Sequence, residues 1–541
     1  IMFFDLDAYN RFNMSKEEVE LADANKDDKE KKEDEKKEEA KKKADEKQKK
    51  TGKIEVEKVK PLELDIENCR DRIVRLTANS SHMGDAVLSK DGDKLYYQAA
   101  FEDGYDLWQH DLKDGSTKLV MKGVGQGNLQ TDKDVKNLFI CNGSSIKKVD
   151  LSGFSTKNIS FEANFNYKPA EERQYLFDHV WRQVKDKFYD PKIHGVDWEG
   201  YRKTYEKFLP YINNNFDFQE MLSEMLGELN ASHTGARYYA SNSALTTANL
   251  GVFFDPQYQG DGLKIQEIIK RGPFDVKNTG VKAGSIIESI DGEEIKAGMD
   301  YFPLLDGKVG KNVRLGIRNA KGKKMEVTVK AISQSKLNNL LYKRWVDRNR
   351  AFVDSISGGR IAYVHVKAMN SESFRTVYSE LLSDKNRNRD AVIVDERHNG
   401  GGWLHDDLCT LLNGKQYQEF VPHGKVVGRD PFNKWVKPSC VMICENDYSN
   451  GHGFPWVYKE LGIGKLIGAP VAGTMTAVWW ETLMDNTLVF GIPQVGCRDM
   501  RGVFGENNQL NPDIEVYNSP EDFINGHDTQ LERAVREMMK K

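Results

Sequence analysis

The sequence has few of the features that hold metals, build disulfide frameworks or cross membranes. It contains six cysteines in 541 residues, and no pair at CxxC spacing is followed by a second pair or by paired histidines. The longest apolar runs, such as 391–394, are far shorter than the ~20 residues that a membrane-spanning helix needs. Because 79 Lys and Arg nearly balance 83 Asp and Glu, no global field would attract nucleic acid. We therefore expect no disulfide framework, no metal, no membrane span and no nucleic-acid partner.

The length indicates several domains, and 39% hydrophobic residues exclude a disordered chain. The chain begins at Ile1 without a charged segment followed by an apolar core, so an N-terminal part, with any signal peptide on it, is expected to lie outside this sequence.

The N-terminal third combines a charged segment with short strands. Residues 21–53 are dominated by Lys, Glu, Asp and Ala and are interpreted as a solvated insertion or linker. In 54–165, two turns at 89–92 and 131–134 lie 42 residues apart, the spacing of propeller blades. We interpret this part as the last blades of a partial β-propeller, with 1–20 as the end of a preceding blade. A small independent β-domain is the alternative.

Two further modules follow. Apolar residues at helical spacing in 166–245 predict a helical domain, in which Asp217 and Glu220 would form a capping box. Residues 246–333 form a β-rich module that resembles a PDZ domain, whose glycine-containing loop at 280–285 would offer N–H groups to a peptide carboxylate. Alternatively, this module only packs against its neighbours.

Residues 334–541 alternate between strands and helices, which predicts an α/β domain with a largely parallel sheet. Chemistry in such sheets gathers at the carboxyl ends of the strands. The strand 391–396 leads into the glycine turn 400–402, whose N–H groups suit a developing oxyanion. The next strand leads to Ser449 at a strand-to-helix turn, the arrangement of an activated nucleophile. The candidates for its base and supporting carboxylate are His233, His398, His452, Glu506 and Asp513.

These segments together resemble the tricorn protease family of S41-type serine peptidases over residues 166–541. The resemblance rests on the segment 227–233 with its Ser-His pair, the glycine turn, and the segment 505–513 with its Glu. Two registers compete for the nucleophile: Ser449 lies 19 residues before Gly468, as the family pattern requires, whereas Gly451 lies only 17. The Ser-Lys dyad of related peptidases would need a Lys in 469–482, where none occurs.

The resemblance implies a crotonase-like catalytic domain without a cofactor. Ser449 would be the nucleophile, His233 the base, and Ser232 and Glu506 its orienting partners. The oxyanion hole would comprise Gly400, Gly401 and the N–H of Asn450, which stands where the family has Asp. The specificity carboxylate of the family would lie between Gln416 and Lys437.

The same resemblance implies short peptide substrates, a homo-oligomer, specifically a hexamer, and a cytoplasmic location. A periplasmic location is the alternative if a signal peptide precedes the sequence. The alternative function is a catalytically silent scaffold that binds peptides through the PDZ-like module. Retention of the full set of four catalytic residues favours the peptidase.

Overall fold

The computed structural model describes residues 1–15, 17–22, 64–77, 80–101, 104–143, 145–240, 245–276 and 279–540. These residues form two compact units, Ile1–Asn166 and Tyr167–Lys541. Nearly all of the predicted charged linker lies outside the described residues. In the part of the chain that is described, no helix combines the length and apolar character needed to cross a bilayer.

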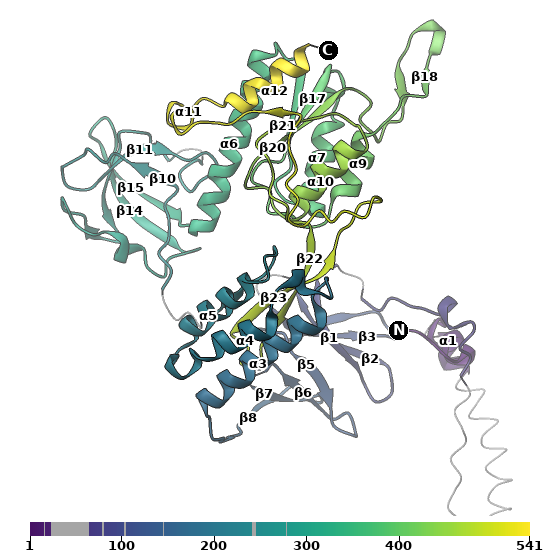
Figure 1. Ribbon diagram of the computed structural model, residues 1–541. Helices are drawn as coiled ribbons and strands as arrows, with labels where there is room; N and C mark the ends of the chain where they lie inside the picture. Colours follow the sequence, from purple (N-terminus) through teal and green to yellow (C-terminus); the bar gives the residue numbers. More distant parts are fainter. Residues whose placement is uncertain are drawn as a thin grey trace, which may run out of the picture. The chain divides into compact units, whose positions relative to one another are not determined.

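The first unit contains two four-stranded antiparallel sheets, each with its strands in chain order (Figure 1). Such meanders are the units from which propellers are built, but two of them do not form a ring, so a propeller stays a prediction. The strands are β1 (His82–Leu88), β2 (Lys94–Ala100), β3 (Asp106–Asp111), β4 (Thr117–Met121), β5 (Asn128–Thr131), β6 (Asn137–Cys141), β7 (Ile146–Asp150) and β8 (Thr156–Ile159).

The N-terminal residues of this unit form little regular structure. Helix α1 (Leu6–Phe12) and the short 3₁₀ helix η1 (Cys69–Asp71) flank the undescribed segment. Met2, expected to belong to the last strand of a preceding blade, forms a single antiparallel bridge with Ile73.

The second unit begins with a helical layer that packs on a three-stranded sheet of order β22-β23-β9. This sheet joins residues far apart in sequence, because β9 follows the helices whereas β22 and β23 come from the C-terminal part of the chain. Leu176, Phe218 and Phe490 meet in the shared core. The elements are α3 (Pro169–Lys187), α4 (Trp198–Glu206), α5 (Asn215–Gly227), β9 (Ala236–Tyr238), β22 (Thr476–Thr482) and β23 (Leu488–Gly496), with 3₁₀ turns at Ile193–Gly195 and Leu209–Tyr211.

The predicted capping box of Asp217 and Glu220 is wrong. Helix α5 begins earlier, and the side chain of Asn214 accepts from the Asp217 N–H at 2.9 Å. Asn214 is also a good N-cap residue, and by capping there the helix gains almost one more turn.

The PDZ-like module is a separate sheet of order β10-β11-β12-β14-β15, with β13 paired to β12. Its own core includes Ile265, Ile287 and Leu315. The strands are β10 (Val252–Phe254), β11 (Leu263–Ile268), β12 (Ile286–Ile290), β13 (Glu293–Glu294), β14 (Asn312–Arg318) and β15 (Lys324–Lys330), with a 3₁₀ turn at Phe302–Leu305.

The α/β domain is a five-stranded parallel sheet covered on both faces, as predicted. One face packs against α7, α9 and α10, and the other against α6 and α12. The helices are α6 (Gln334–Ile356), α7 (Ser371–Leu381), α8 (Asp384–Arg387), α9 (His405–Leu412), α10 (Asn450–Glu460), α11 (Pro520–Asn525) and α12 (Thr529–Met539). The strands, in sheet order, are β16 (Ile361–His365), β17 (Ala391–Asp395), β20 (Ser439–Ile443), β21 (Lys465–Gly468) and β24 (Ile514–Glu515).

A hairpin of β18 (Gln418–Phe420) and β19 (Gly428–Asp430) projects from the body of this domain (Figure 1). The glycine turn and Ser449 follow β17 and β20, which are neighbours in the sheet. Both therefore leave the same edge of the sheet.

Candidate active site

Ser449 occupies the sharp turn between β20 and α10. Its backbone has φ 57° and ψ −121°, a conformation that is strained for any residue with a side chain. The Ser449 N–H donates to the Thr474 hydroxyl at 2.9 Å. Gly451, the competing position, lies inside α10, and a Cβ there would be only 2.7 Å from the Asn399 carbonyl oxygen. The strained strand-to-helix turn that exposes a nucleophile is thus found at Ser449.

The glycine turn lies directly against this serine. Gly401 has φ 93°, and a Cβ there would come within 2.6 Å of Ser449 Cβ. Its N–H donates to Asn399 Oδ1 at 2.8 Å. The N–H groups of Gly400 and Asn450, in contrast, have no acceptor among the described residues. The available N–H donors are therefore those of Gly400 and Asn450, whereas the N–H of Gly401 is already engaged.

The Asn450 side chain has a role that the sequence did not reveal. Its Oδ1 accepts from the backbone N–H groups of Leu404 and His405 at 2.8 and 3.1 Å, and its Nδ2 lies 2.8 Å from His405 Nδ1. Asn450 thereby fixes the start of α9 next to the glycine turn. Its side chain is 6% exposed.

Ser232, His233 and Glu506 form one connected set. Glu506 accepts from the Ser232 N–H at 2.5 Å and from the Ser232 hydroxyl at 2.9 Å. Because this hydroxyl donates its one hydrogen to Glu506, its oxygen accepts from His233 Nδ1–H across 2.8 Å. We assign the Nδ1–H tautomer on this basis, which leaves Nε2 as the basic nitrogen.

Burial lowers the pKa of His233 to about 4. The imidazole is therefore neutral near pH 7, as a general base must be before the reaction. The ring of His233 lies 4.8 Å from that of Tyr448, and the backbone N–H of His233 donates to the Tyr448 hydroxyl at 2.7 Å. Tyr448 precedes Ser449, so this contact joins the turn that carries His233 to the turn that carries Ser449. Thr476, on β22, adds a contact of 3.1 Å to His233 Nδ1.

Ser449 and His233 line the same cavity, which has a volume of about 720 Å³. Gly400 and Asn450 line it too, whereas Glu506 does not. This volume is in the range of pockets that enclose ligands the size of a short peptide. The structure thus brings the predicted nucleophile, base and oxyanion donors to one space, and it places Glu506 behind them.

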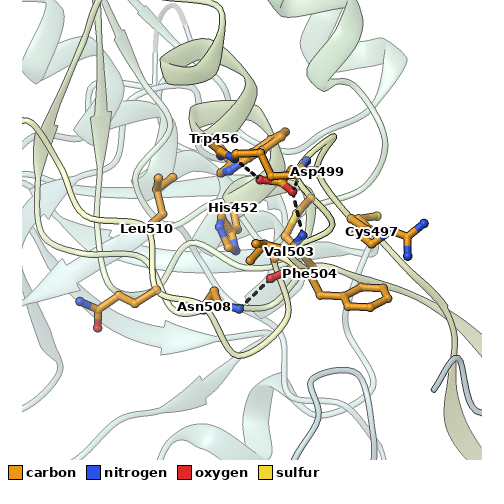
Figure 2. A pocket seen from close by; sticks show the side chains of 13 residues that line it. His452, Trp456, Cys497, Asp499, Val503, Phe504, Asn508 and Leu510 are labelled. Atoms are coloured by element: carbon orange, nitrogen blue, oxygen red, sulfur yellow. Dashed lines mark hydrogen bonds and ion pairs between the residues drawn. The ribbon is translucent and has the colours of Figure 1, made fainter. Parts of the chain in front are cut away.

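A second cavity of about 300 Å³ lies next to the first, because Trp456, Met475 and Cys497 line both (Figure 2). His452, one of the predicted candidate bases, lines this second cavity. Its Nδ1 accepts from the Thr474 N–H at 3.2 Å, and burial lowers its pKa to about 4. His452 therefore supports Thr474, the residue that holds the Ser449 N–H.

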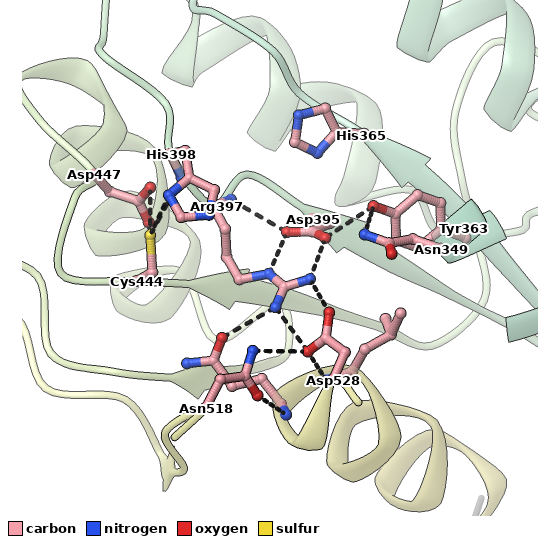
Figure 3. A network of polar contacts seen from close by, with 12 residues as sticks. Asn349, Tyr363, His365, Asp395, Arg397, His398, Cys444, Asp447, Asn518 and Asp528 are labelled. Atoms are coloured by element: carbon pink, nitrogen blue, oxygen red, sulfur yellow. Dashed lines mark hydrogen bonds and ion pairs between the residues drawn. The ribbon is translucent and has the colours of Figure 1, made fainter. Parts of the chain in front are cut away.

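A polar network surrounds Arg397 and Asp395 in the domain that also carries Ser449 (Figure 3). The Arg397 side chain, 3% exposed, pairs with Asp395 at 2.8 Å and with Asp528 at 2.9 Å. Asp447 accepts from the N–H groups of Asn399 and Cys444 at 3.1 and 2.8 Å. The contacts of Arg397 fix α12 to the sheet. The contacts of Asp447 fix the start of the glycine turn to the turn that carries Ser449.

Burial dominates the electrostatics of this network. It raises the pKa of Asp447 to about 8, although two backbone N–H groups favour the charged form. Burial also raises the pKa of Glu396 well above its usual value, with the nearby carboxylates adding to the effect. Neither carboxyl oxygen of Glu396 has a hydrogen-bond partner among the described residues. Burial thus favours the neutral form of both carboxyl groups.

The remaining sequence candidates, His398 and Asp513, do not line the cavity that Ser449 and His233 share. His398 contacts Cys444 and Asn446 on the network side. Asp513 accepts from the Leu466 N–H and pairs with Lys459, which places it in a structural role.

Sequence reasoning missed Tyr448, Thr474 and Thr476. Each acts through a hydroxyl that meets a partner distant in sequence. The only available signal was their proximity to residues already selected.

Three family models match the chain in succession. They are the tricorn protease C1 domain at residues 169–227, the tricorn protease PDZ domain at 255–334, and peptidase family S41 at 360–516. The C-terminal region that carries Ser449 and the glycine turn is thus an S41 peptidase domain. The tricorn protease C1 and PDZ models match ahead of it in that order, and the chain is similar to curated tricorn proteases.

Individual relatives agree with this assignment. A putative tricorn-like protease C-terminal subunit of Sulfurisphaera tokodaii is 29% identical over 69% of this chain and 44% of its own length. The tricorn protease of Thermoplasma acidophilum is 25% identical over 68% of this chain and 34% of its own length. The chain spans less than half the length of these curated relatives. The crystal structure of the tricorn protease shares the fold, with a TM-score of 0.71 and 20% identity over 90% of this chain and 49% of that one.

Proposed function

We propose that this chain is a serine peptidase that cleaves short peptides through an acyl-enzyme on Ser449. The observation that carries the proposal is the shared cavity: Ser449 and His233 line one space, and the Nδ1 of that histidine is already engaged through Ser232 and Glu506.

In the proposed reaction, Ser449 Oγ attacks the carbonyl carbon of the substrate while His233 Nε2 takes the hydroxyl proton. The negative charge that develops on the carbonyl oxygen is stabilised by the N–H groups of Gly400 and Asn450, which no described residue occupies. His233 then returns the proton to the leaving amine as the C–N bond breaks. Water attacks the resulting ester by the same route in reverse and releases the second product.

The positioning residues have separate tasks in this scheme. Glu506 and Ser232 hold His233 in the tautomer that leaves Nε2 basic. Tyr448 binds the backbone of His233, and Thr474 binds the N–H of Ser449. We further propose that the active form is a cytoplasmic homo-oligomer, by analogy with the family.

The scaffold alternative is weakened by the PDZ-like loop. In the loop at 280–285, the N–H groups of Lys282, Gly284 and Ser285 already donate to acceptors within the module. A peptide carboxylate would have to displace these bonds. The module therefore fits a packing role better than the binding role on which the scaffold depends.

The test is digestion of a mixed-sequence peptide library, with the products identified by mass spectrometry. We expect cleavage by the wild type and by Ser379→Ala, an exposed serine of the same domain, and none by Ser449→Ala. Equal cleavage by Ser449→Ala would refute the nucleophile assignment. An intact library after incubation with the oligomeric wild type would favour the scaffold.

A further inference from the structure

The catalytic cavity has an unusual charge distribution. Among the described residues, neither Asp nor Glu lines it, whereas Arg237 does. The nearby carboxylate of Glu506 is 3% exposed and binds Ser232 with both oxygens. A substrate in this cavity therefore meets a fixed positive charge and no side-chain carboxylate of the described chain.

Arg237 is held in place without being neutralised. Its guanidinium carbon lies 4.0 Å from the centre of the Trp480 ring, which is a cation–π contact. Among the described residues, no carboxylate forms an ion pair with it, in contrast to Arg202 and Arg397 in the same unit. Stacking orients the planar group and leaves its N–H edge available, which is the geometry for binding a carboxylate with two hydrogen bonds.

The strand β22 relates this arginine to the reacting groups. Thr476, Ala477, Val478 and Trp480 all line the cavity, so its wall follows β22 from Thr476 to Trp480. Thr476 contacts His233. At a rise of about 3.3 Å per residue, the Cα of Trp480 is about 13 Å further along the strand. That length corresponds to about four residues of an extended peptide.

We propose that Arg237, stacked on Trp480, binds a carboxylate of the peptide substrate within about four residues of the bond that is cut. This inference rests on the proposed peptidase function and adds the class of substrate. The carboxylate can belong to an Asp or Glu side chain or to the C-terminus of the peptide.

The acidic residues in the segment that the resemblance singles out for specificity do not change this charge balance. Glu419 and Asp430 lie on the β18–β19 hairpin, where Glu419 pairs with Arg429 at 3.0 Å and Asp430 accepts from Gln418 at 2.6 Å. Neither lines the cavity. A basic side chain near Arg237 would be repelled, with no carboxylate of the described lining to compensate.

The experiment compares peptides that differ only in charge. Each carries Asp, Asn or Lys at one of the four positions on either side of the cleaved bond, with a C-terminal acid or amide. We expect the wild type to prefer one carboxylate by roughly tenfold to a hundredfold in kcat/KM, the strength of charge-assisted hydrogen bonds. A preference for Asp at one position shows that the bound carboxylate is a side chain. A preference for the C-terminal acid over the amide shows that it is the C-terminus of the peptide.

Variants assign that preference to Arg237. Arg237→Gln should abolish it, and Arg237→Glu should reverse it toward Lys. Arg536→Gln, which removes an exposed arginine of α12, should leave it unchanged. No preference in the wild type, or an unchanged preference in Arg237→Gln, would overturn the inference.

Two readouts separate this inference from the peptidase proposal. Labelling of Ser449 by a fluorophosphonate reports on the nucleophile and should be the same in Arg237→Gln as in the wild type. Binding of the acidic and neutral peptides to Ser449→Ala, measured by fluorescence anisotropy, reports on Arg237 without catalysis. The carboxylate site can be tested even if the wild type cleaves nothing. It is supported if Ser449→Ala binds the acidic peptide more tightly than the neutral one and Ser449→Ala/Arg237→Gln does not. Equal binding of the two peptides to Ser449→Ala refutes it.

Discussion

Two polar regions flank Ser449, and they treat charge in opposite ways. In the network around Asp395, Arg397 is matched by two carboxylates and is almost completely buried. In the cavity that Ser449 lines, Arg237 has no carboxylate partner among the described residues. His233 is neutral there, and none of these residues forms a hydrogen bond with its Nε2. In the network, Arg397 and its two carboxylates satisfy one another and fix α12 to the sheet. The cavity leaves groups unsatisfied, so that a substrate can use them.

The largest expected effect comes from removing the base. His233→Ala should lower kcat/KM by about 10⁴-fold or more, because Ser449 then has no acceptor for its proton. The free energy of unfolding should change by only about 1 kcal/mol. His527→Ala, an exposed histidine near the C-terminus, is the matched control and should keep full activity. Equal activity in His233→Ala and the control would remove His233 from the mechanism.

In the network, the main effect of a substitution should be on the free energy of unfolding. Arg397→Met leaves Asp395 and Asp528 without their buried cation, which should lower the free energy of unfolding by about 3–5 kcal/mol. Trp345, whose ring lies 5.7 Å from the Arg397 guanidinium, provides a local fluorescence signal for urea denaturation. Arg536→Met removes an exposed pair and should cost less than about 0.5 kcal/mol. Similar losses in the two variants would contradict the distinction between the regions.

Glu506 tests how the base is oriented. Glu506→Gln should lower kcat/KM by about 10²-fold, because an amide has one acceptor oxygen where Ser232 presents two donors. The histidine then loses its preference for the Nδ1–H tautomer. Glu481→Gln alters a carboxylate of β22 that binds His179 and Lys187, and it should have little effect on kcat/KM. A comparable loss in Glu481→Gln would mean that Glu506 acts only through general stability.

The smallest expected effect is on the pH dependence. Desolvation disfavours the charged imidazolium of His233, so its pKa falls to about 4 and the basic form persists above that value. We expect kcat/KM to stay constant from pH 8 to about pH 5 and to fall tenfold per pH unit below about 4. Rates at defined pH, corrected for unfolding, measure this. A decrease centred near pH 6.5 would mean that the base is not desolvated.

Much of the fold was predictable because its signals are local. Buried β-type runs at 391–396 and 439–444 predicted the central strands, and helical spacing predicted α3 and α5. The strands β1 and β5 have no such signal, because their side chains are largely polar or exposed. The sheet β22-β23-β9 was not predictable either, since it pairs residues about 250 positions apart, which no local pattern reveals.

The candidate site was predictable where a residue type is tied to a backbone geometry. Ser449 and the glycine turn follow predicted strands, and the structure places them together. The engagement of the Gly401 N–H depends on one hydrogen bond to Asn399, and the role proposed for Arg237 depends on a ring contact with Trp480. Contacts of this kind are decided by tertiary packing, so the sequence alone could not indicate them.

The central claim is that the turn at Ser449 carries an activated nucleophile. The most direct measurement is to incubate the purified chain with a fluorophosphonate and to locate the modified residue by peptide mass spectrometry. We expect one adduct, on Ser449, that is absent in His233→Ala and unchanged in His527→Ala. A folded, assembled chain that remains unmodified at Ser449, or that reacts equally well without His233, would contradict it.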